Sequence, residues 1–181
     1  HMYSHIIETK FAKDETDIIF LKYIHLKLEM MSRTVLIIPL PLETLTHGDY
    51  HTSNLLIDGT RKIIGICDWE QASMNARSYE LARSLLYVCF NGKSEEEPNN
   101  YDNDVATTFA QAFMSGYSSI YPISHAELVQ GMKSRWKRLV RSFWIEEQYY
   151  TNKDARSCKF ISHEMRLILD FANEKIVNKL L

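Results

Sequence analysis

The sequence lacks paired cysteines, long apolar runs and a strong net charge, and each absence excludes a class of protein. Its three cysteines, Cys67, Cys89 and Cys158, are widely spaced and form no CxxC pair. That pattern fits neither a disulfide framework nor a zinc site, and it favours a reducing compartment. We therefore expect a cytoplasmic protein.

No apolar run reaches the roughly 18 residues that a membrane-spanning helix needs, and no basic stretch leads into an apolar block near the N-terminus. The net charge is only -2 and the pI is near 6.4, so the chain has no general attraction to phosphate backbones or anionic lipid. We expect no nucleic-acid partner and no membrane partner. With 181 residues, 45% of them hydrophobic, the chain can form one domain with a real core.

The sequence contains one predicted hairpin among predicted helices. Apolar residues recur at helical spacing over residues 14–31, and Pro39 and Pro41 then prevent a helix from continuing before a loop that begins at Leu45. Two β-prone runs, residues 54–57 and 62–67, are separated by a short turn that contains Gly59. Helical spacing returns from Tyr79 to Asn91.

The remainder of the chain is predicted to be helical over residues 105–117, 124–150 and 157–181, after an acidic loop at residues 93–104. Ser124 and Glu127 have the spacing of a capping box. The fold class expected is α+β and mainly α, with helices around a short β-hairpin.

Three side chains within one short stretch have the chemistry that phosphoryl transfer needs. Asp49 lies on a predicted loop, Asn54 follows five residues later, and Asp68 ends the second strand of the hairpin. Transfer from ATP needs a carboxylate that accepts the proton of the attacking hydroxyl, and oxygen ligands for magnesium. Because a hairpin folds the chain back on itself, Asp68 is expected to return beside Asn54.

Residues 47–58, HGDYHTSNLLID, resemble the HGDxHxxNLLxD catalytic loop of aminoglycoside phosphotransferases and the related choline and homoserine kinases. Residues 66–70, ICDWE, resemble the IDWE segment of the same family. Residues 79–82, YELA, resemble its YDLA helix, with Glu80 in place of the usual Asp. The resemblance implies a protein-kinase-like fold, with Mg2+ as cofactor and ATP as phosphoryl donor.

The resemblance also implies a role for each matching residue. Asp49 is expected to be the catalytic base, and Asn54 and Asp68 are expected to be magnesium ligands. His47 is expected to support the catalytic loop rather than take part in chemistry, and His51 is a second candidate support. The segment Trp69–Glu70 follows the metal-binding Asp and either lines the site or packs against the core.

The family's glycine-rich, ATP-clamping N-terminal lobe has no counterpart before the first predicted helix. We therefore expect residues 3–181 to be the C-terminal lobe alone, with His1 and Met2 as a cloning remnant. Such a chain is expected to bind ATP weakly, with a dissociation constant of about 1 mM or above, and to be inactive or very weak alone. The alternative is a non-catalytic binding or regulatory module that retains a kinase-like loop.

Other interpretations of single segments are less favoured. His47, Asp49 and His51 form an HxDxH pattern, but a hydrolase metal site would need further ligands. The basic run over residues 133–141 alternates with apolar residues, which favours a solvated helix face over a nucleic-acid surface. The acidic residues 95–97 favour a solvated loop over a site for a cationic acceptor. The small-molecule hydroxyl acceptor itself is left open, from aminoglycosides to sugars, and with it any role in antibiotic resistance.

Overall fold

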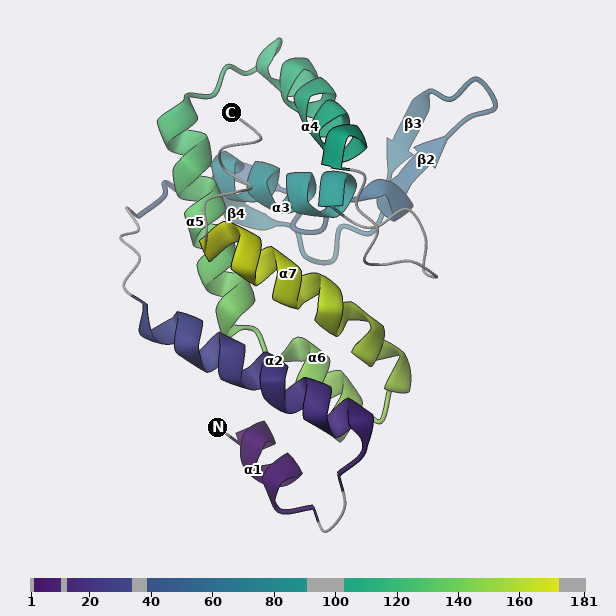
Figure 1. The fold of residues 1–181 in the computed structure, drawn as a ribbon. Coiled ribbons are helices and arrows are strands. Elements are labelled where there is room, and N and C mark those ends of the chain that lie inside the picture. The colour runs from purple at the N-terminus through teal and green to yellow at the C-terminus, as the bar shows by residue number, and fades with distance from the viewer. Residues whose placement is uncertain (1, 11–12, 34–38, 91–102, 173–181) are drawn as a thin grey trace.

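A computed structural model of the chain describes residues 2–10, 13–33, 39–90 and 103–172. They form a mainly helical α+β structure with two small antiparallel sheets (Figure 1). The helices are α1 (Met2–Glu8), α2 (Glu15–Ser32), α3 (Arg77–Phe90), α4 (Asn103–Ser118), α5 (His125–Arg141), α6 (Trp144–Glu146) and α7 (Ile161–Ala172). The strands are β1 (Thr44–Thr46), β2 (Leu55–Ile57), β3 (Ile63–Ile66) and β4 (Ser73–Asn75).

The predicted helix over residues 14–31 is confirmed as α2, and its start has a clear local cause. Asp14 is the N-cap and accepts a hydrogen bond from the Asp17 amide, while the Asp17 carboxylate accepts one from the Asp14 amide. This reciprocal capping satisfies two amides that a helix start would otherwise leave free. α1, which was not predicted, precedes it and packs Tyr3 and Ile7 into the core.

α5 is the helix that connects the two parts of the structure. It packs against α3 beside the sheets and against α2 and α7 farther along its length (Figure 1). Gly131 permits the close approach of α5 to α3, because a Cβ at this position would lie 2.2 Å from the Ser78 carbonyl oxygen. Met132, Leu139 and Val140 are buried on the packed side of α5. The packed face predicted for the basic run over residues 133–141 is therefore confirmed.

The predicted hairpin is confirmed, with β2 and β3 paired antiparallel so that Leu55 faces Ile66. The second sheet was not predicted. β1 pairs antiparallel with β4, and Thr46 faces Ser73 across it. The loop expected to begin at Leu45 therefore begins after Thr46. Strands of three residues are too short to show a periodic pattern, so only their pairing defines them.

Two helix predictions in the second half of the chain are confirmed over α5 and α7 and wrong in part of their extent. The helix predicted over residues 124–150 ends at Arg141, because Ser142 is extended, and α6 and a π-helical turn (Glu147–Thr151) follow. The helix predicted from Ser157 begins as a 3-10 segment (Ala155–Phe160) and becomes α-helical at Ile161. Residues 173–181 of that prediction lie outside the described residues.

Three further expectations are corrected or fall outside the described ranges. The predicted capping box at Ser124 is half formed: the Glu127 amide donates to Ser124 Oγ, but the Glu127 carboxylate pairs with Arg77 instead. Residues 103 and 104, predicted as loop, begin α4. The rest of the acidic loop, including residues 95–97, lies outside the described residues. In the part of the chain that is described, no helix is long and apolar enough to span a membrane.

Candidate active site

The loop between β1 and β2 is held in place by His47, which is buried. Its Nε2 lies 2.8 Å from the Cys67 carbonyl oxygen, and its Nδ1 accepts a hydrogen bond from the Asp49 amide at 3.2 Å. These two partners require a neutral ring with the proton on Nε2. His47 thus joins the loop that carries Asp49 to the segment that carries Asp68.

Gly48 is required by the path of the same loop. Its φ of 78° lies in the left-handed region, and an added Cβ would lie 2.2 Å from the Gln71 carbonyl oxygen. Its amide donates to Glu80 Oε1 at 3.0 Å. Glu80, at the position where the resemblance led us to expect Asp, therefore fixes the loop between β1 and β2 from α3.

The Asp49 carboxylate is engaged on both oxygens. Arg83 on α3 donates to Oδ1 at 2.7 Å, and Gln71 donates to Oδ2 at 3.4 Å. His51 Nε2 lies 3.6 Å from Oδ2, and His51 Nδ1 accepts from the Ser53 amide. Sequence reasoning missed Arg83 and Gln71. The sequence contained one signal for Arg83: it lies three residues after Glu80, and residues three apart in a helix are neighbours on its surface.

The hairpin pairs the backbone of Asn54 with that of Cys67, the residue before Asp68. Asn54 is buried, and its Nδ2 donates to the Asp49 carbonyl at 2.9 Å, which leaves Oδ1 as the acceptor atom of its side chain. The Cys67 amide donates to the Asn54 carbonyl at 3.0 Å, so Asp68 follows the residue that faces Asn54. Asp68 is exposed and has a φ of 64°, a left-handed conformation that Asp adopts more readily than most residues.

This donor set fits magnesium. An exposed carboxylate and an amide oxygen beside it are hard oxygen ligands, and magnesium is usually held by one or two carboxylates together with phosphates and water. Within the described residues, no group of three or more His, Cys, Asp and Glu side chains is arranged to hold a metal ion. The described residues therefore supply no further ligand for a metal site built on the HxDxH pattern of residues 47–51.

Trp69 lies against His47, with ring centroids 4.6 Å apart, and its Nε1 donates to the Ile66 carbonyl. It is 48% exposed, so it covers the loop from outside rather than packing in the core. Glu70 is exposed in the turn that follows.

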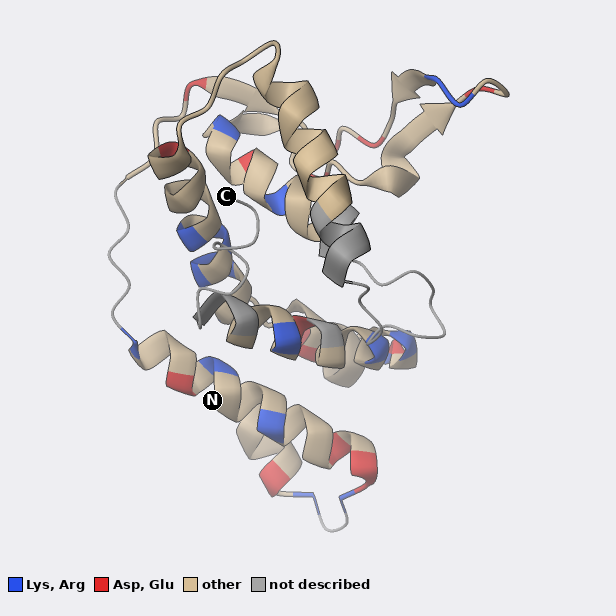
Figure 2. Ribbon diagram, turned by 45° about the horizontal axis from the view of Figure 1, so that its top comes forward, with Lys and Arg blue, Asp and Glu red and all other residues tan. Residues whose placement is uncertain are grey.

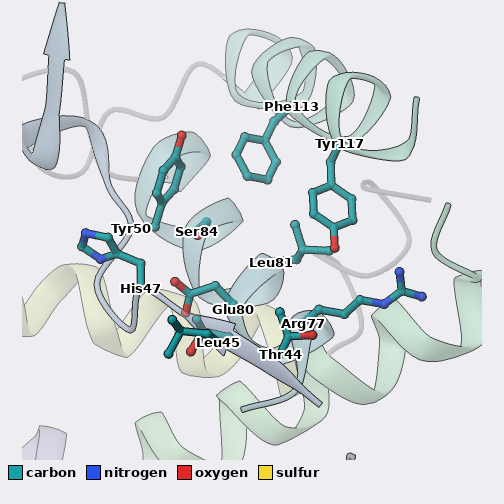
Figure 3. Close-up of a pocket in the computed structure, with 11 residues that line it drawn as sticks. Thr44, Leu45, His47, Tyr50, Arg77, Glu80, Leu81, Ser84, Phe113 and Tyr117 are labelled. Atoms are coloured by element: carbon teal, nitrogen blue, oxygen red, sulfur yellow. The ribbon is translucent and has the colours of Figure 1, made fainter. Parts of the chain in front are cut away.

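A cavity of about 430 Å3 lies beside the loop, bounded by β1, α3 and α4 (Figure 3). His47 and Tyr50 belong to its wall, whereas Asp49 is not among the described residues that line it. The cavity was not predicted, because its wall combines residues from separate parts of the sequence.

Residues 33–123 match the model of the phosphotransferase enzyme family, APH, which covers half of the chain. The chain therefore belongs to this family, and the resemblance drawn from residues 47–58 and 66–70 is confirmed. Membership supports a phosphotransferase of the kinase type in general. No curated protein and no solved structure matches the chain.

Proposed function

We propose that this chain is the C-terminal lobe of a kinase that transfers the γ-phosphoryl group of ATP to a hydroxyl of a small molecule. The observation that carries the proposal is the convergence of three residues. It is supported by two hydrogen bonds: Asn54 donates to the Asp49 carbonyl, and the Cys67 amide, one residue before Asp68, donates to the Asn54 carbonyl. A base carboxylate and two oxygen ligands in one place match the needs of phosphoryl transfer.

Asp49 would act as the base. As the acceptor oxygen attacks the γ-phosphorus, its proton passes to a carboxylate oxygen of Asp49 while the bond to the ADP oxygen breaks. Arg83 holds the other oxygen of that carboxylate and so fixes its orientation. Asn54 Oδ1 and the Asp68 carboxylate would hold Mg2+, which when bound neutralises charge on the phosphates.

Exposed apolar residues on the hairpin of β2 and β3 are an argument for a second lobe. Leu56, Ile57, Ile63 and Ile64 are each more than half exposed, and the hairpin projects from the helical body (Figure 1). Contiguous exposed apolar residues of this kind mark a surface that another structure covers. We propose that a nucleotide-binding lobe of the complete protein packs there. The isolated chain would then bind ATP weakly, because most of the surface that grips the nucleotide belongs to that lobe.

Metal binding by the chain itself tests the site. Mn2+, a paramagnetic substitute for Mg2+, should broaden the NMR signals of residues 49, 54 and 68 selectively. Asn54→Ala should weaken this binding by about tenfold or more because it removes an oxygen ligand, and Asp68→Asn should do so because it replaces a charged carboxylate oxygen by a neutral amide oxygen. Glu43→Gln is the matched control, since it removes an exposed carboxylate ahead of β1. Broadening that is equal in all four proteins would refute the ligand assignment.

A further inference from the structure

The cavity beside the catalytic loop has the size of a small-molecule site. Its volume of about 430 Å3 lies within the range of about 300–1,000 Å3 that ligand pockets occupy. β1 and the loop form one wall, and α3 and α4 form the others (Figure 3). The described residues that line it are Thr44, Leu45, Thr46, His47, Tyr50 and, from the two helices, Arg77, Glu80, Leu81, Ser84, Phe113 and Tyr117.

The described lining offers few charged groups to a ligand. Among the described lining residues these are Arg77 and Glu80. Arg77 is neutralised by a two-bond pair with Glu127 at 2.8 and 2.9 Å. Glu80 keeps its negative charge, because its one printed partner is the neutral Gly48 amide at 3.0 Å. The described side chains of α4 carry no charge, as the tan ribbon shows (Figure 2). An anion would therefore meet no free cation on the described lining and a polycation only one carboxylate, and burying the remaining unpaired charge is costly.

Aromatic rings and hydroxyls make up much of the remaining surface. The rings of Tyr50 and Phe113 have centroids 6.4 Å apart, and Tyr117 lies one turn beyond Phe113 on α4 (Figure 3). Ser84, Thr44 and Thr46 add hydroxyl groups. Such a surface suits a flat apolar ring or the apolar face of a sugar, with hydroxyls that can hydrogen-bond at its edge.

The cavity is also next to the proposed base. His47 and Tyr50, which line it, flank Asp49 closely in sequence, and consecutive Cα atoms are only about 3.8 Å apart. A molecule seated between Tyr50 and Phe113 could extend a hydroxyl past Tyr50 toward the Asp49 carboxylate. A bound polyamine, by contrast, would find that carboxylate paired with Arg83.

We propose that the acceptor is an uncharged hydroxylated molecule with a flat, aromatic or apolar-faced body, which binds in this cavity. A polycationic amino sugar would need more counter-ions than the described lining supplies. The inference rests on the proposed function for the identity of the ligand as an acceptor, but the binding itself needs neither ATP nor metal.

Binding is measured on this chain by NMR chemical-shift changes, without ATP. The aromatic neutral probes are 4-nitrophenyl glucoside and pyrimidine nucleosides. Methyl glucoside is the neutral probe without an aromatic ring, and kanamycin is the polycation. We expect saturable shifts at Tyr50, Phe113 and Tyr117 for at least one aromatic neutral probe at millimolar concentration. Methyl glucoside should bind about three- to tenfold more weakly, because it lacks the ring.

A matched pair of variants localises the binding. Phe113→Leu keeps an apolar side chain but removes the ring, and should weaken the neutral probe by about three- to tenfold. Phe109→Leu, one turn earlier on α4, removes a ring that is 55% exposed and outside the described lining, and should change nothing. A thermal melt confirms that both variants are folded.

Two results would overturn the inference: kanamycin shifting these three residues at lower concentration than every neutral probe, or no neutral probe shifting them at all. Transfer of phosphate to a polycation by the complete protein would overturn it while leaving the proposed kinase function intact. Neutral binding in the cavity together with a complete absence of transfer would instead refute the kinase function.

Discussion

At the scale of single residues, the least expected contact is the one between Arg83 and the proposed base. The guanidinium donates to Asp49 Oδ1 at 2.7 Å, and both side chains are largely buried. One turn earlier, Glu80 holds the amide of Gly48. α3 thus fixes two successive residues of the catalytic loop from one side. The other carboxylate oxygen, Oδ2, has only the longer contacts to Gln71 and His51, at 3.4 and 3.6 Å.

Removing the Arg83 guanidinium should impair turnover more than binding. In the complete protein, Arg83→Met is expected to lower kcat of phosphoryl transfer by up to about 100-fold, because the base carboxylate loses its orientation, while KM changes little. Arg83→Lys should recover part of the loss. Steady-state kinetics measure both parameters.

The control for this prediction is Arg156→Met, which removes an arginine that is exposed and paired with Asp154 far from the loop. It should leave kcat and KM unchanged. A rise in KM with constant kcat for Arg83→Met would mean that Arg83 binds substrate and does not position the base.

From the sequence alone, residues of the proposed site could be named only where they belong to a local sequence motif. His47, Asp49 and Asn54 lie within one loop, and Asp68 follows from a hairpin whose turn is visible in the sequence. Arg83 reaches Asp49 because α3 packs against the loop, and Gln71 reaches it because the segment between β3 and β4 lies beside Gly48. Both are tertiary contacts that local periodicity does not contain.

At the scale of elements, a buried lysine contacts the point where the helix predicted over residues 124–150 breaks. Lys27 on α2 is fully buried, donates to the Ser142 carbonyl, and lies 3.1 Å from Glu146 Oε1 and 3.9 Å from Glu164 Oε2. Because Ser142 leaves the helical conformation, its carbonyl is free to accept from Lys27. The helical period of the sequence showed the elements on either side of this break but not the break itself.

Burial controls the protonation of this cluster. It raises the pKa of Glu146 and of Glu164 above the ordinary value of 4.5, although Lys27 acts in the opposite direction. Burial also lowers the pKa of Lys27, against the attraction of both carboxylates. Because the two carboxyl pKa values are raised in the fold, their neutral forms stabilise it fully below pH 4.5, and that stability is lost as pH rises through the folded pKa values.

Lys27→Met should therefore destabilise the fold in a pH-dependent way. At pH 7 we expect a loss of about 3–5 kcal/mol in the free energy of unfolding, because buried carboxylates are left without a cation. The loss should shrink as pH falls toward 4.5 and the carboxyls become neutral. Urea denaturation across this pH range measures it. Lys22→Met, on the exposed side of α2, is the control, and an equal effect of both variants would contradict the prediction.

At the scale of the whole molecule, the proposed catalytic residues and most of the helical core lie in different parts of the structure. The proposed catalytic residues lie on the loop between β1 and β2 and just after β3, while α2 and α7 lie in the helical body below and α5 runs from beside α3 down into that body (Figure 1). The family match ends at residue 123, before α5 begins. The mainly helical α+β class followed from periodicity and from one hairpin, whereas the β1–β4 sheet and the cavity depend on contacts between distant segments.

The central claim is that Asp49 is the base of a phosphoryl transfer. The most direct test compares the complete protein with its Asp49→Asn variant, following phosphorylated acceptor and ADP by 31P NMR under saturating Mg2+ and ATP. Asn keeps the shape of the side chain but cannot take the proton, so transfer should fall by about 10²- to 10⁴-fold in a variant that a thermal melt shows to be folded. Unchanged turnover in the folded variant would contradict the assignment of Asp49.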